Sequence, residues 1–419
     1  MKGKDTATGI KIGDRLEVTV DSVAFGGSGV GRVGNLVVFV PFTVDGDTVE
    51  IEIDGMRRSY ATGRIGRILN PSPFRTRAEC PHYERCGGCQ YQHMTYDHQL
   101  DLKKRQVGEA FVRIGKVPDP PVRDVLPSPL PYAYRGKAEF HLRFAPGKSA
   151  LIGYKEAADS RIVPVPRCEI VDESINRSLT LLRKKLEGGH SASRRGRKRE
   201  ERVVLWSETG AATAETDSPP LRKNRVLRQV KGKIFRVPAL GFFQANLSLV
   251  ETMVDTVVRA CALSGAENLL DAYCGSGLFS LFLAPRVKRL FGVDADREAI
   301  RCAEENLRDE GISNGEFYAG DVGEILKHFL ERKTPVDIVV LDPPRIGCSS
   351  DVLAGLLRLK PRRIVYISCN PATQARDMRR LLDGGYTLKE LQPLDMFPQT
   401  KHIEVVGLLE RQGEEGGES

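Results

Sequence analysis

The chain of 419 residues is long enough for two or three domains, and its hydrophobic fraction of 41% suffices for a sizeable core. The net charge of +8 is a moderate basic excess, compatible with a nucleic-acid partner without identifying one. No apolar run approaches the ~18–20 residues that span a bilayer, and the first residues lack the apolar core of a signal peptide. We therefore expect a soluble cytoplasmic protein without a membrane segment.

Residues 9–68 alternate apolar and polar side chains over short runs, with Gly- and Asp-rich turns between them. About five short strands in so short a segment predict a small β-barrel. The segment resembles a TRAM domain, an OB-like RNA-binding barrel found in RNA-modifying enzymes. A barrel that serves only as a spacer is the alternative.

Three cysteines with the spacing C-x5-C-x2-C follow this segment, at Cys80, Cys86 and Cys89. In a reducing compartment such clustering favours a metal over disulfides. Three thiolates can hold zinc or an iron–sulfur cluster if a fourth ligand joins them. Cys168 is the candidate, because it is the only other cysteine before residue 261. The asymmetric spacing favours a [4Fe–4S] cluster over zinc, and cysteines without a ligand are the alternative.

Residues 132–187 read as alternating strands followed by a helix, which predicts a central mixed α+β domain. Two basic stretches interrupt it, over residues 191–202 and 221–233. Such stretches either are solvated loops or neutralise phosphates, and the sequence favours neither interpretation.

From residue 246 onward, strands and amphipathic helices alternate, which is typical of a doubly wound parallel sheet. The overall prediction is an α/β fold with three domains: a barrel over 1–70, a central domain over 71–240 and a Rossmann-like domain over 241–419.

A glycine turn that includes Gly275 follows the first of these strands, which opens with Asp271. Asp294 ends the next strand about 20 residues on, where an acid suits the ribose hydroxyls of an adenosine ligand. Asp321 ends a plausible third strand, where it could meet an adenine amino group. The combination resembles class I S-adenosylmethionine-dependent methyltransferases. A NAD site is the alternative, disfavoured because the third glycine of its fingerprint is absent.

Cys369 follows an apolar strand, and Asn370 and Pro371 read as a helix start directly after it. The helix terminus and nearby cations are expected to lower the pKa of the thiol and make it a nucleophile. A small buried hydrophobe is the alternative. A thiol is needed where the methylated atom is a poor nucleophile, such as carbon 5 of a pyrimidine. In the Asp342–Arg345 motif an Arg replaces the aromatic residue of amine methyltransferases, which disfavours methylation of an amine.

The motifs DAYCGSG, DPPR, SCNP and HIEVV, in that order, resemble the RNA (uracil-5-)-methyltransferase family. With the barrel and the cysteines, they look like its ribosomal-RNA branch, which carries a [4Fe–4S] cluster. The resemblance implies that Cys369 is the nucleophile and Glu404 the proton acceptor, although spacing alone makes Glu404 no more than an exposed charge at a strand start. It further implies S-adenosylmethionine contacts from Gln244, Tyr273, Asp294 and Asp342, and cluster ligands in Cys80, Cys86, Cys89 and Cys168.

Two departures from the family pattern are Leu278, where several relatives carry Asn, and the basic insert over 191–202. The resemblance implies an RNA substrate, 23S rRNA first and tRNA second, with the target base out of its stack. Phe242 and Phe243 could support such a base, although a core position is favoured for both. The absence of heptads predicts a monomer.

Two rival functions remain open at this point. An RNA 5-methylcytosine methyltransferase would use the same thiol addition, with Cys348 as the nucleophile. A non-catalytic RNA-binding or redox-sensing protein would use the barrel and the cluster alone.

Overall fold

The computed structural model describes residues 9–145, 148–157, 159–188, 199–207, 213–216 and 225–412. It divides into two compact units, which are described separately. The first consists of Met1–Gln106, Gly153–Val165 and Pro398–Lys401, and the second of Val107–Ile152, Pro166–Phe397 and His402–Ser419. The three-domain division at residues 70 and 240 stays a prediction.

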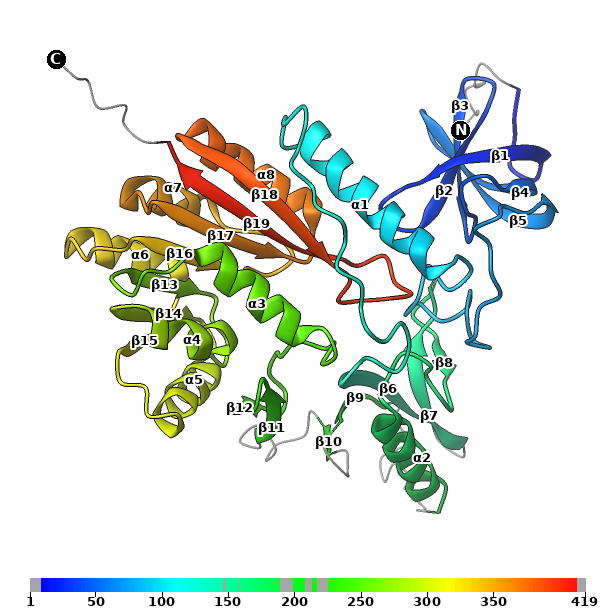
Figure 1. Ribbon diagram of the computed structural model, residues 1–419. Coiled ribbons are helices and arrows are strands. Elements are labelled where there is room, and N and C mark those ends of the chain that lie inside the picture. Colours follow the sequence, from blue (N-terminus) through cyan, green and yellow to red (C-terminus); the bar gives the residue numbers. More distant parts are fainter. Residues whose placement is uncertain are drawn as a thin grey trace. The chain divides into compact units, whose positions relative to one another are not determined.

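A closed five-stranded barrel with the strand order β1-β2-β3-β5-β4 forms most of the first unit (Figure 1). Its strands are β1 (Arg15–Val23), β2 (Ser28–Val33), β3 (Leu36–Pro41), β4 (Thr48–Met56) and β5 (Tyr60–Asn70). Alternate residues point inward, so that side chains such as Val38, Val49 and Ile51 are fully buried in the barrel core. The predicted OB-like barrel is therefore confirmed.

The rest of the first unit includes the loop that carries Cys80, Cys86 and Cys89 (the cysteine loop), most of helix α1 (Tyr96–Arg113), a short hairpin and residues 398–401. The hairpin joins the end of β7 (Lys148–Lys155) to β8 (Ile162–Pro164), with Tyr154 opposite Val163. The cysteine loop contacts this hairpin, because Cys86 pairs with Glu156 in an isolated β-bridge. Helix α1 is not evident from the sequence, because its polar surface leaves only a weak apolar stripe.

The second unit begins with the predicted mixed α+β elements. Strands β10, β9 and β6 neighbour one another and β7 follows β6, while β11 and β12 form a separate hairpin. The bounds of these elements are β6 (Lys137–Ala145), α2 (Glu173–Gly188), β9 (Arg199–Trp206), β10 (Thr213–Thr216), β11 (Arg225–Val230) and β12 (Lys233–Pro238).

The described part of the basic stretch over 221–233 is neither a solvated loop nor a free phosphate-binding surface. Arg225 pairs with Glu298 and Glu305 of the helix over residues 297–309, and Lys231 pairs with Asp255 of the helix over residues 250–261. Arg228 is buried and lies over the Trp206 ring. These cations are paired or buried within the second unit. They are therefore neither in a solvated loop nor free to bind phosphates, and both interpretations from sequence are wrong for them. In the insert over 191–202, residues 191–198 lie outside the described residues.

A seven-stranded sheet with the order β15-β14-β13-β16-β17-β19-β18 dominates the second unit. Its strands are β13 (Asn268–Ala272), β14 (Arg289–Asp294), β15 (Gly315–Ala319), β16 (Ile338–Leu341), β17 (Arg363–Ser368), β18 (Tyr386–Leu394) and β19 (Glu404–Arg411). The first five run parallel, whereas β19 is antiparallel to both β17 and β18. The predicted doubly wound α/β fold is confirmed, and the structure adds an antiparallel pair of strands at one end of the sheet.

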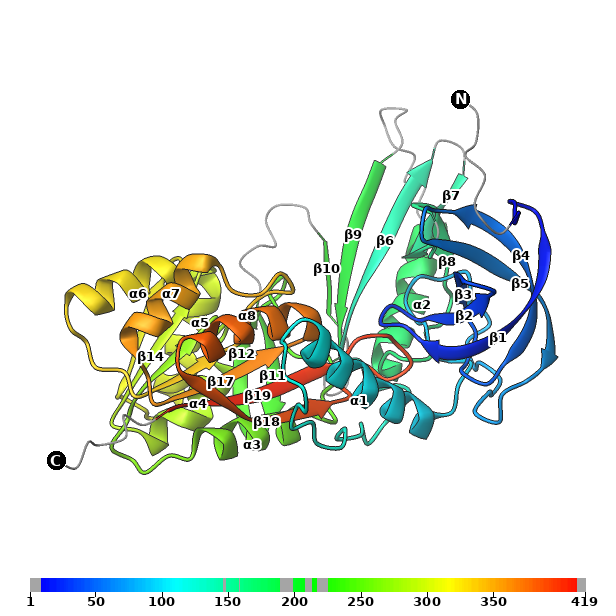
Figure 2. The ribbon, with the colours of Figure 1, turned by 90° about the horizontal axis from the view of Figure 1, so that it is seen from above.

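Helices cover both faces of this sheet (Figure 2). Val365 and Ile367 of β17 belong to the core cluster that includes side chains of α3, whereas the hydroxyl of Tyr366 on the opposite face reaches Asp377 of α8. The helices are α3 (Val250–Cys261), α4 (Leu278–Leu283), η2 (Ala284–Arg286), α5 (Arg297–Asp309), α6 (Val322–Glu331), α7 (Ser350–Leu359) and α8 (Pro371–Asp383).

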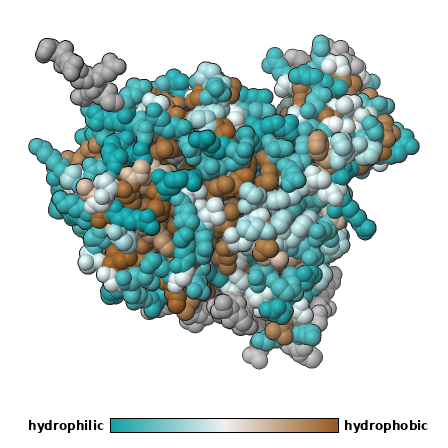
Figure 3. Space-filling view, in the orientation of Figure 1, coloured by the Kyte–Doolittle hydropathy of each residue, from teal (hydrophilic) through white to brown (hydrophobic). Residues whose placement is uncertain are grey.

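Hydrophilic residues predominate on the face drawn in Figure 3, with hydrophobic residues in separate groups among them. Within the described ranges, no helix has both the length and the apolar composition to cross a membrane.

Candidate active site

The carboxyl ends of β13, β14, β16 and β17 meet at one edge of the seven-stranded sheet. The strand order reverses between β13 and β16, because the chain runs outward from β13 through β14 to β15 and then returns to β16. Ligands of open α/β sheets bind in the crevice at such a reversal. Every residue predicted for the cofactor and for catalysis belongs to this second unit.

The turn after β13 has the shape of a ligand cradle. Tyr273, Gly275 and Gly277 have positive φ angles of 64°, 54° and 80°. Gly275 donates its N–H to Asp294 Oδ2 at 2.9 Å, and a Cβ at Gly275 would meet no atom within 4 Å. The turn therefore leaves open space where a ligand can approach the backbone closely.

Asp271 Oδ1 in β13 and Ser276 Oγ in the turn are buried and have no hydrogen-bond partner within the described residues, and the same holds for Gln244 Oε1, shortly before α3. Buried polar groups are almost always paired, so atoms of this kind at a sheet edge mark groups that a ligand satisfies. The residues present thus fit a polar cofactor. The sequence analysis did not single out Ser276, although its place inside the glycine turn could have drawn attention to it.

Asp271 and Asp321 differ in setting. The Asp271 carboxylate is fully buried and accepts a hydrogen bond from Ser280 Oγ at 2.5 Å, and burial raises its pKa to about 7. Asp321 lies on the surface two residues after β15, where its side chain accepts from Glu324 N and caps α6. Asp321 Oδ2 is the oxygen that the cap leaves open to a ligand.

The pairing register brings Cys369 to Glu404. Ser368 pairs with Val405 in the antiparallel β17–β19 ladder, so the next residue of one strand faces the preceding residue of the other. The charge of Glu404 acts on the pKa of the Cys369 thiol, and those of Asp342 and Arg345 do so as well. Glu404 is only 4% exposed, so the alternative of a solvated charge at the strand start is wrong.

The pKa of Cys369 contradicts the expectation from sequence. Burial, followed by the charge of Glu404, raises it to about 11, and the Arg345 guanidinium opposes the rise through its charge and a hydrogen bond. Asn370 caps α8 as predicted, but the helix terminus does not outweigh the burial of the thiol. Burial and the charge of Asp342 likewise raise the pKa of Glu404 well above its usual range.

The loop after β16 is fixed to the start of α8. Asn370 Nδ2 and Thr373 Oγ1 donate to the carbonyl of Arg345 at 3.2 and 3.1 Å. Gly347 has a φ of 80°, and a Cβ there would overlap the carboxylate of Asp377. The DPPR segment and the strand end that carries Cys369 therefore hold a defined relative position.

Cys348 takes part in a buried network. Its N–H donates to Asp377 Oδ2 at 2.8 Å, and its thiol shares hydrogen bonds with the hydroxyls of Tyr273 and Tyr366. Burial raises its pKa to about 12, and the side chain is enclosed, whereas Cys369 is half-buried. This arrangement favours Cys369 over Cys348 as the nucleophile and makes Cys348 a support for Tyr273.

Phe242 and Phe243, the two aromatic residues before Gln244, differ in burial. Phe243 is buried beside Phe235, as the core interpretation expected. Phe242 is 70% exposed, so the core interpretation is wrong for it. The exposed ring of Phe242, two residues before Gln244, is available to stack on a base.

The four predicted cluster cysteines are divided between the two units. Cys80, Cys86 and Cys89 lie half-buried in one loop of the first unit, and Cys168 lies buried in the second. Over the described ranges, no group of three or more His, Cys, Asp or Glu side chains is arranged to hold a metal ion. The cluster therefore stays a prediction from the spacing of the cysteines.

Comparisons with known proteins bear on both units. A family model described as tRNA (Uracil-5-)-methyltransferase matches residues 224–412, and a model described as TRAM domain matches residues 10–65. An uncharacterized RNA methyltransferase of Halalkalibacterium halodurans is 32% identical over 445 residues, which cover 95% of this chain and 97% of that one. One from Gloeobacter violaceus is 34% identical over 448 residues, with coverage of 95% and 97%.

A solved structure is also similar over almost the whole chain. It is the tRNA (uracil-54, C5)-methyltransferase of Pyrococcus abyssi in complex with S-adenosyl-L-homocysteine, with a TM-score of 0.71 and 23% identity. The match covers 94% of this chain and 100% of the Pyrococcus chain. At this identity the likeness shows a shared fold.

Proposed function

We propose, from the premise that this chain belongs to the tRNA (uracil-5-)-methyltransferase family of RNA methyltransferases, that it methylates carbon 5 of a specific uridine in RNA. S-adenosylmethionine supplies the methyl group. The observation that carries the proposal is the buried Glu404 carboxyl beside the Cys369 thiol, at the sheet edge where the glycine turn and Asp342 also lie.

Each of these residues has a role in the proposed reaction. The Cys369 thiolate adds to carbon 6 of the uracil, which makes carbon 5 nucleophilic enough to take the methyl group. Glu404 then removes the proton from carbon 5, and elimination releases Cys369 as a thiolate. The proton that Glu404 removes is the one proton that the overall reaction releases. Arg345 stabilises the thiolate, because its charge and hydrogen bond oppose the rise of the Cys369 pKa.

Residues around the glycine turn hold the cofactor in this proposal. Asp294 accepts from the ribose hydroxyls while it keeps the hydrogen bond from Gly275, since a carboxylate has about four acceptor sites. Gln244, Tyr273 and Asp342 line the same edge. Asp321 meets the adenine amino group with the oxygen that does not cap α6.

Two RNA targets follow from different observations. The cysteine spacing and the TRAM barrel resemble the ribosomal-RNA branch, which favours 23S rRNA. The matching family model is described as a tRNA methyltransferase, and the Pyrococcus protein of similar structure is named as one too, which supports tRNA as the second candidate.

The test incubates the anaerobically purified full chain with labelled S-adenosylmethionine and separate pools of unmodified 23S rRNA and tRNA. Mass spectrometry then identifies the methylated base. We expect 5-methyluridine in 23S rRNA, and 5-methyluridine in tRNA alone would keep the chemistry and change the target. 5-Methylcytosine would make Cys348 the nucleophile, and no transfer by a protein that binds the cofactor would support a non-catalytic RNA-binding protein.

The [4Fe–4S] cluster is the remaining part of the proposal, with a structural and RNA-docking role. It is supported by the spacing of Cys80, Cys86 and Cys89 within one loop. We expect iron and sulfide to co-purify with the chain under anaerobic conditions and to be lost in Cys86→Ser, while Cys369→Ala retains both. Equal iron content in the chain and in Cys86→Ser would refute the assignment of these ligands.

A further inference from the structure

We propose that a cavity within the first unit binds one unstacked nucleotide of the substrate RNA, separate from the uridine at the methyl-transfer site. The cavity has a volume of about 630 Å³, within the range of small-molecule sites. Residues of four segments and Lys401 line it: residues 26–28, residues 41–42, residues 154–157, and Glu84, Gly87, Gly88 and Gln90 of the cysteine loop. The inference rests on the proposed function, because it takes RNA as the substrate.

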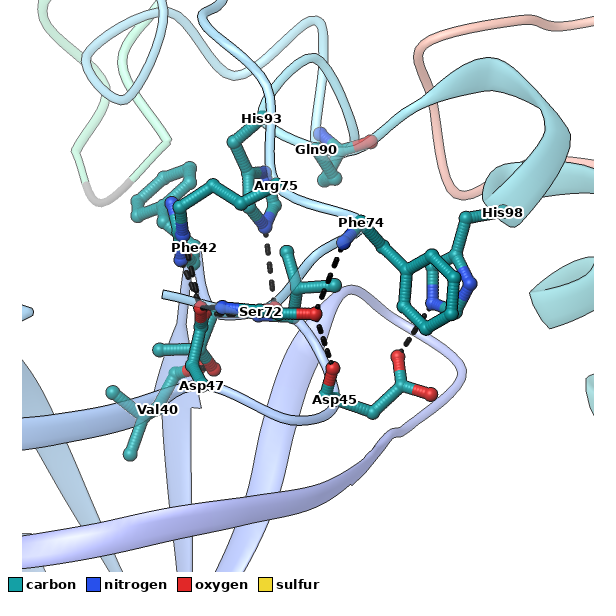
Figure 4. A network of polar contacts seen from close by, with 12 residues as sticks. Val40, Phe42, Asp45, Asp47, Ser72, Phe74, Arg75, Gln90, His93 and His98 are labelled. Carbon is teal, nitrogen blue, oxygen red and sulfur yellow. Dashed lines mark hydrogen bonds and ion pairs between the residues drawn. The ribbon is translucent and has the colours of Figure 1, made fainter. Parts of the chain in front are cut away.

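A prebuilt polar network fixes the aromatic wall of this cavity (Figure 4). Phe42 has a φ of 63°, and its carbonyl accepts a hydrogen bond from Arg75 at 3.0 Å. Arg75 in turn pairs with the fully buried Asp47. The Phe42 ring packs edge-on against Tyr83 and His93, with centroids 5.4 and 6.4 Å apart. The ring is therefore held in place before any ligand arrives.

The same network stays charged at neutral pH. Burial acts to raise the pKa of Asp47, but hydrogen bonds from Arg75, Ser72 N and Val44 N lower it below its usual value. Burial lowers the pKa of His93 to about 4, so this imidazole is neutral. A charged Asp47–Arg75 pair with backbone donors around it makes a rigid support rather than a pH-sensitive one.

The cysteine loop forms a second wall, ordered by its own contacts. The Tyr83 hydroxyl donates to the carbonyl of Gln90 at 2.7 Å, and Gln90 Oε1 accepts from Lys401 N at 3.2 Å. Gly27 approaches this wall so closely that a Cβ there would lie 2.9 Å from Gln90 Cβ. Glycine at this position allows the two chain segments to pack this closely.

The hairpin residues 154–157 form a third wall, which backbone hydrogen bonds join to the cysteine loop. Gly87 N donates to Lys155 O, and Ala157 N donates to Arg85 O, both at 3.0 Å. These bonds connect segments that are about 70 residues apart in the chain, so the cavity is a feature of the folded unit.

The lining combines an aromatic ring with a cation, which is the combination that single-stranded RNA requires. Lys401 lines the cavity, and over the described ranges its ammonium makes no ion pair or side-chain hydrogen bond. Two acids also line the cavity. Glu156 pairs with Arg161 at 2.9 Å and with Arg85 at 3.5 Å, and Lys155, a second cation of the lining, offsets the charge of Glu84. A base can stack on Phe42 while its phosphate meets Lys401.

The test measures the affinity of the full chain for a 12-nucleotide single-stranded RNA by fluorescence anisotropy. Ala157→Trp fills the cavity from an exposed position on its rim, and Lys401→Ala removes the cation. We expect each to weaken binding by about fivefold or more, in line with the loss of one stacked base or one phosphate contact. Lys401→Ala should also reduce the slope of log affinity against log salt by about one, whereas Ala157→Trp should leave it unchanged.

Lys288→Ala is the matched control, because Lys288 is an exposed lysine at the amino end of β14, opposite the ligand edge of its sheet. Its affinity for RNA should stay within twofold of the unmodified chain. All variants should keep the circular dichroism spectrum and the thermal unfolding profile of the unmodified chain, which shows that the first unit still folds.

A second measurement replaces one nucleotide at a time by an abasic residue along the same RNA. The unmodified chain should lose affinity at one position, and Ala157→Trp should be insensitive at that position. RNA affinity that is unchanged in both cavity variants would overturn the cavity assignment and leave the proposed methyltransferase intact. Failure of the unmodified chain to bind or methylate any RNA would instead overturn the proposed function, and the cavity assignment with it.

Discussion

Replacing Glu404 with Gln should move two measurable quantities in opposite directions. The change keeps the size of the side chain and removes the charge that, after burial, contributes most to the raised pKa of Cys369. The pKa of the thiol should therefore fall from about 11 toward its ordinary value of 9.0, without reaching it because the burial remains. Since one pKa unit is tenfold in the thiolate fraction, alkylation of Cys369 should become faster by less than about 100-fold, at a pH above the raised pKa of Glu404 where this carboxyl is ionised.

Turnover should fall in the same variant, because Glu404 is the group that removes the proton from carbon 5 in the proposed reaction. Loss of a positioned general base costs about 10²–10⁴-fold in rate. Methyl transfer can still occur once, so the methylated RNA should remain covalently attached to Cys369. Denaturing gels would show this adduct, and it should be absent from the double variant Glu404→Gln/Cys369→Ala.

The assay pairs the pH profile of iodoacetamide labelling, followed on the peptide that contains Cys369, with multiple-turnover methylation. Glu410→Gln is the control, because Glu410 lies on the same strand and pairs with Arg363 away from the thiol. It should alter neither quantity by more than about twofold, in the range of a surface ion pair. Multiple turnovers at the unmodified rate by Glu404→Gln would refute the role of Glu404. An unchanged pH profile of alkylation would refute the electrostatic argument.

Three further outcomes follow from the structure. Cys369→Ala should abolish methylation and adduct formation. Cys348→Ser should retain methylation within about tenfold and chiefly raise the KM for S-adenosylmethionine. The opposite pattern would make the protein a 5-methylcytosine methyltransferase. Burial raises the pKa of Asp271 from 3.8 to about 7, so the folded state holds a proton that the unfolded state releases and the free energy of unfolding falls as pH rises through this window. Urea denaturation at pH 5 and 7 should show that the free energy of unfolding declines by at most about 1.4 kcal/mol per pH unit, and that the decline is smaller in Asp271→Asn. An equal decline in the variant would show that Asp271 is not its cause. Gly347→Ala should lower the free energy of unfolding, measured by thermal unfolding, by about 1–3 kcal/mol. Gly311→Ala should lower it less, because Gly311 has a similar φ of 70° but a Cβ there would meet open space. Equal losses of stability in the two variants would exclude the overlap with α8.

The local patterns of the chain were sufficient for most of the architecture. Apolar alternation predicted the barrel, and the succession of apolar strands and amphipathic helices predicted the doubly wound sheet. The start of helix α8 at Asn370 and Pro371 was also predicted correctly, because capping and proline preferences act over a few residues. Helix α1 was missed, since its weak apolar stripe leaves little local signal.

Electrostatics and long-range pairing were decided only by the tertiary structure. The sequence places cations and a helix start beside Cys369 and therefore predicts a lowered pKa for its thiol. In the fold the thiol is buried next to the carboxyl of a residue that lies 35 positions later in the chain. Burial outweighs the helix terminus, so the pKa of the thiol rises. The cations over 221–233 resembled a phosphate-binding run, yet Arg225 and Lys231 meet acids on α5 and α3 that no local pattern could assign to them. Sequence therefore determined which elements form and which residues are candidates for chemistry. The fold alone decided which of them meet, because desolvation and Coulomb interactions depend on distances that the packing of remote segments sets.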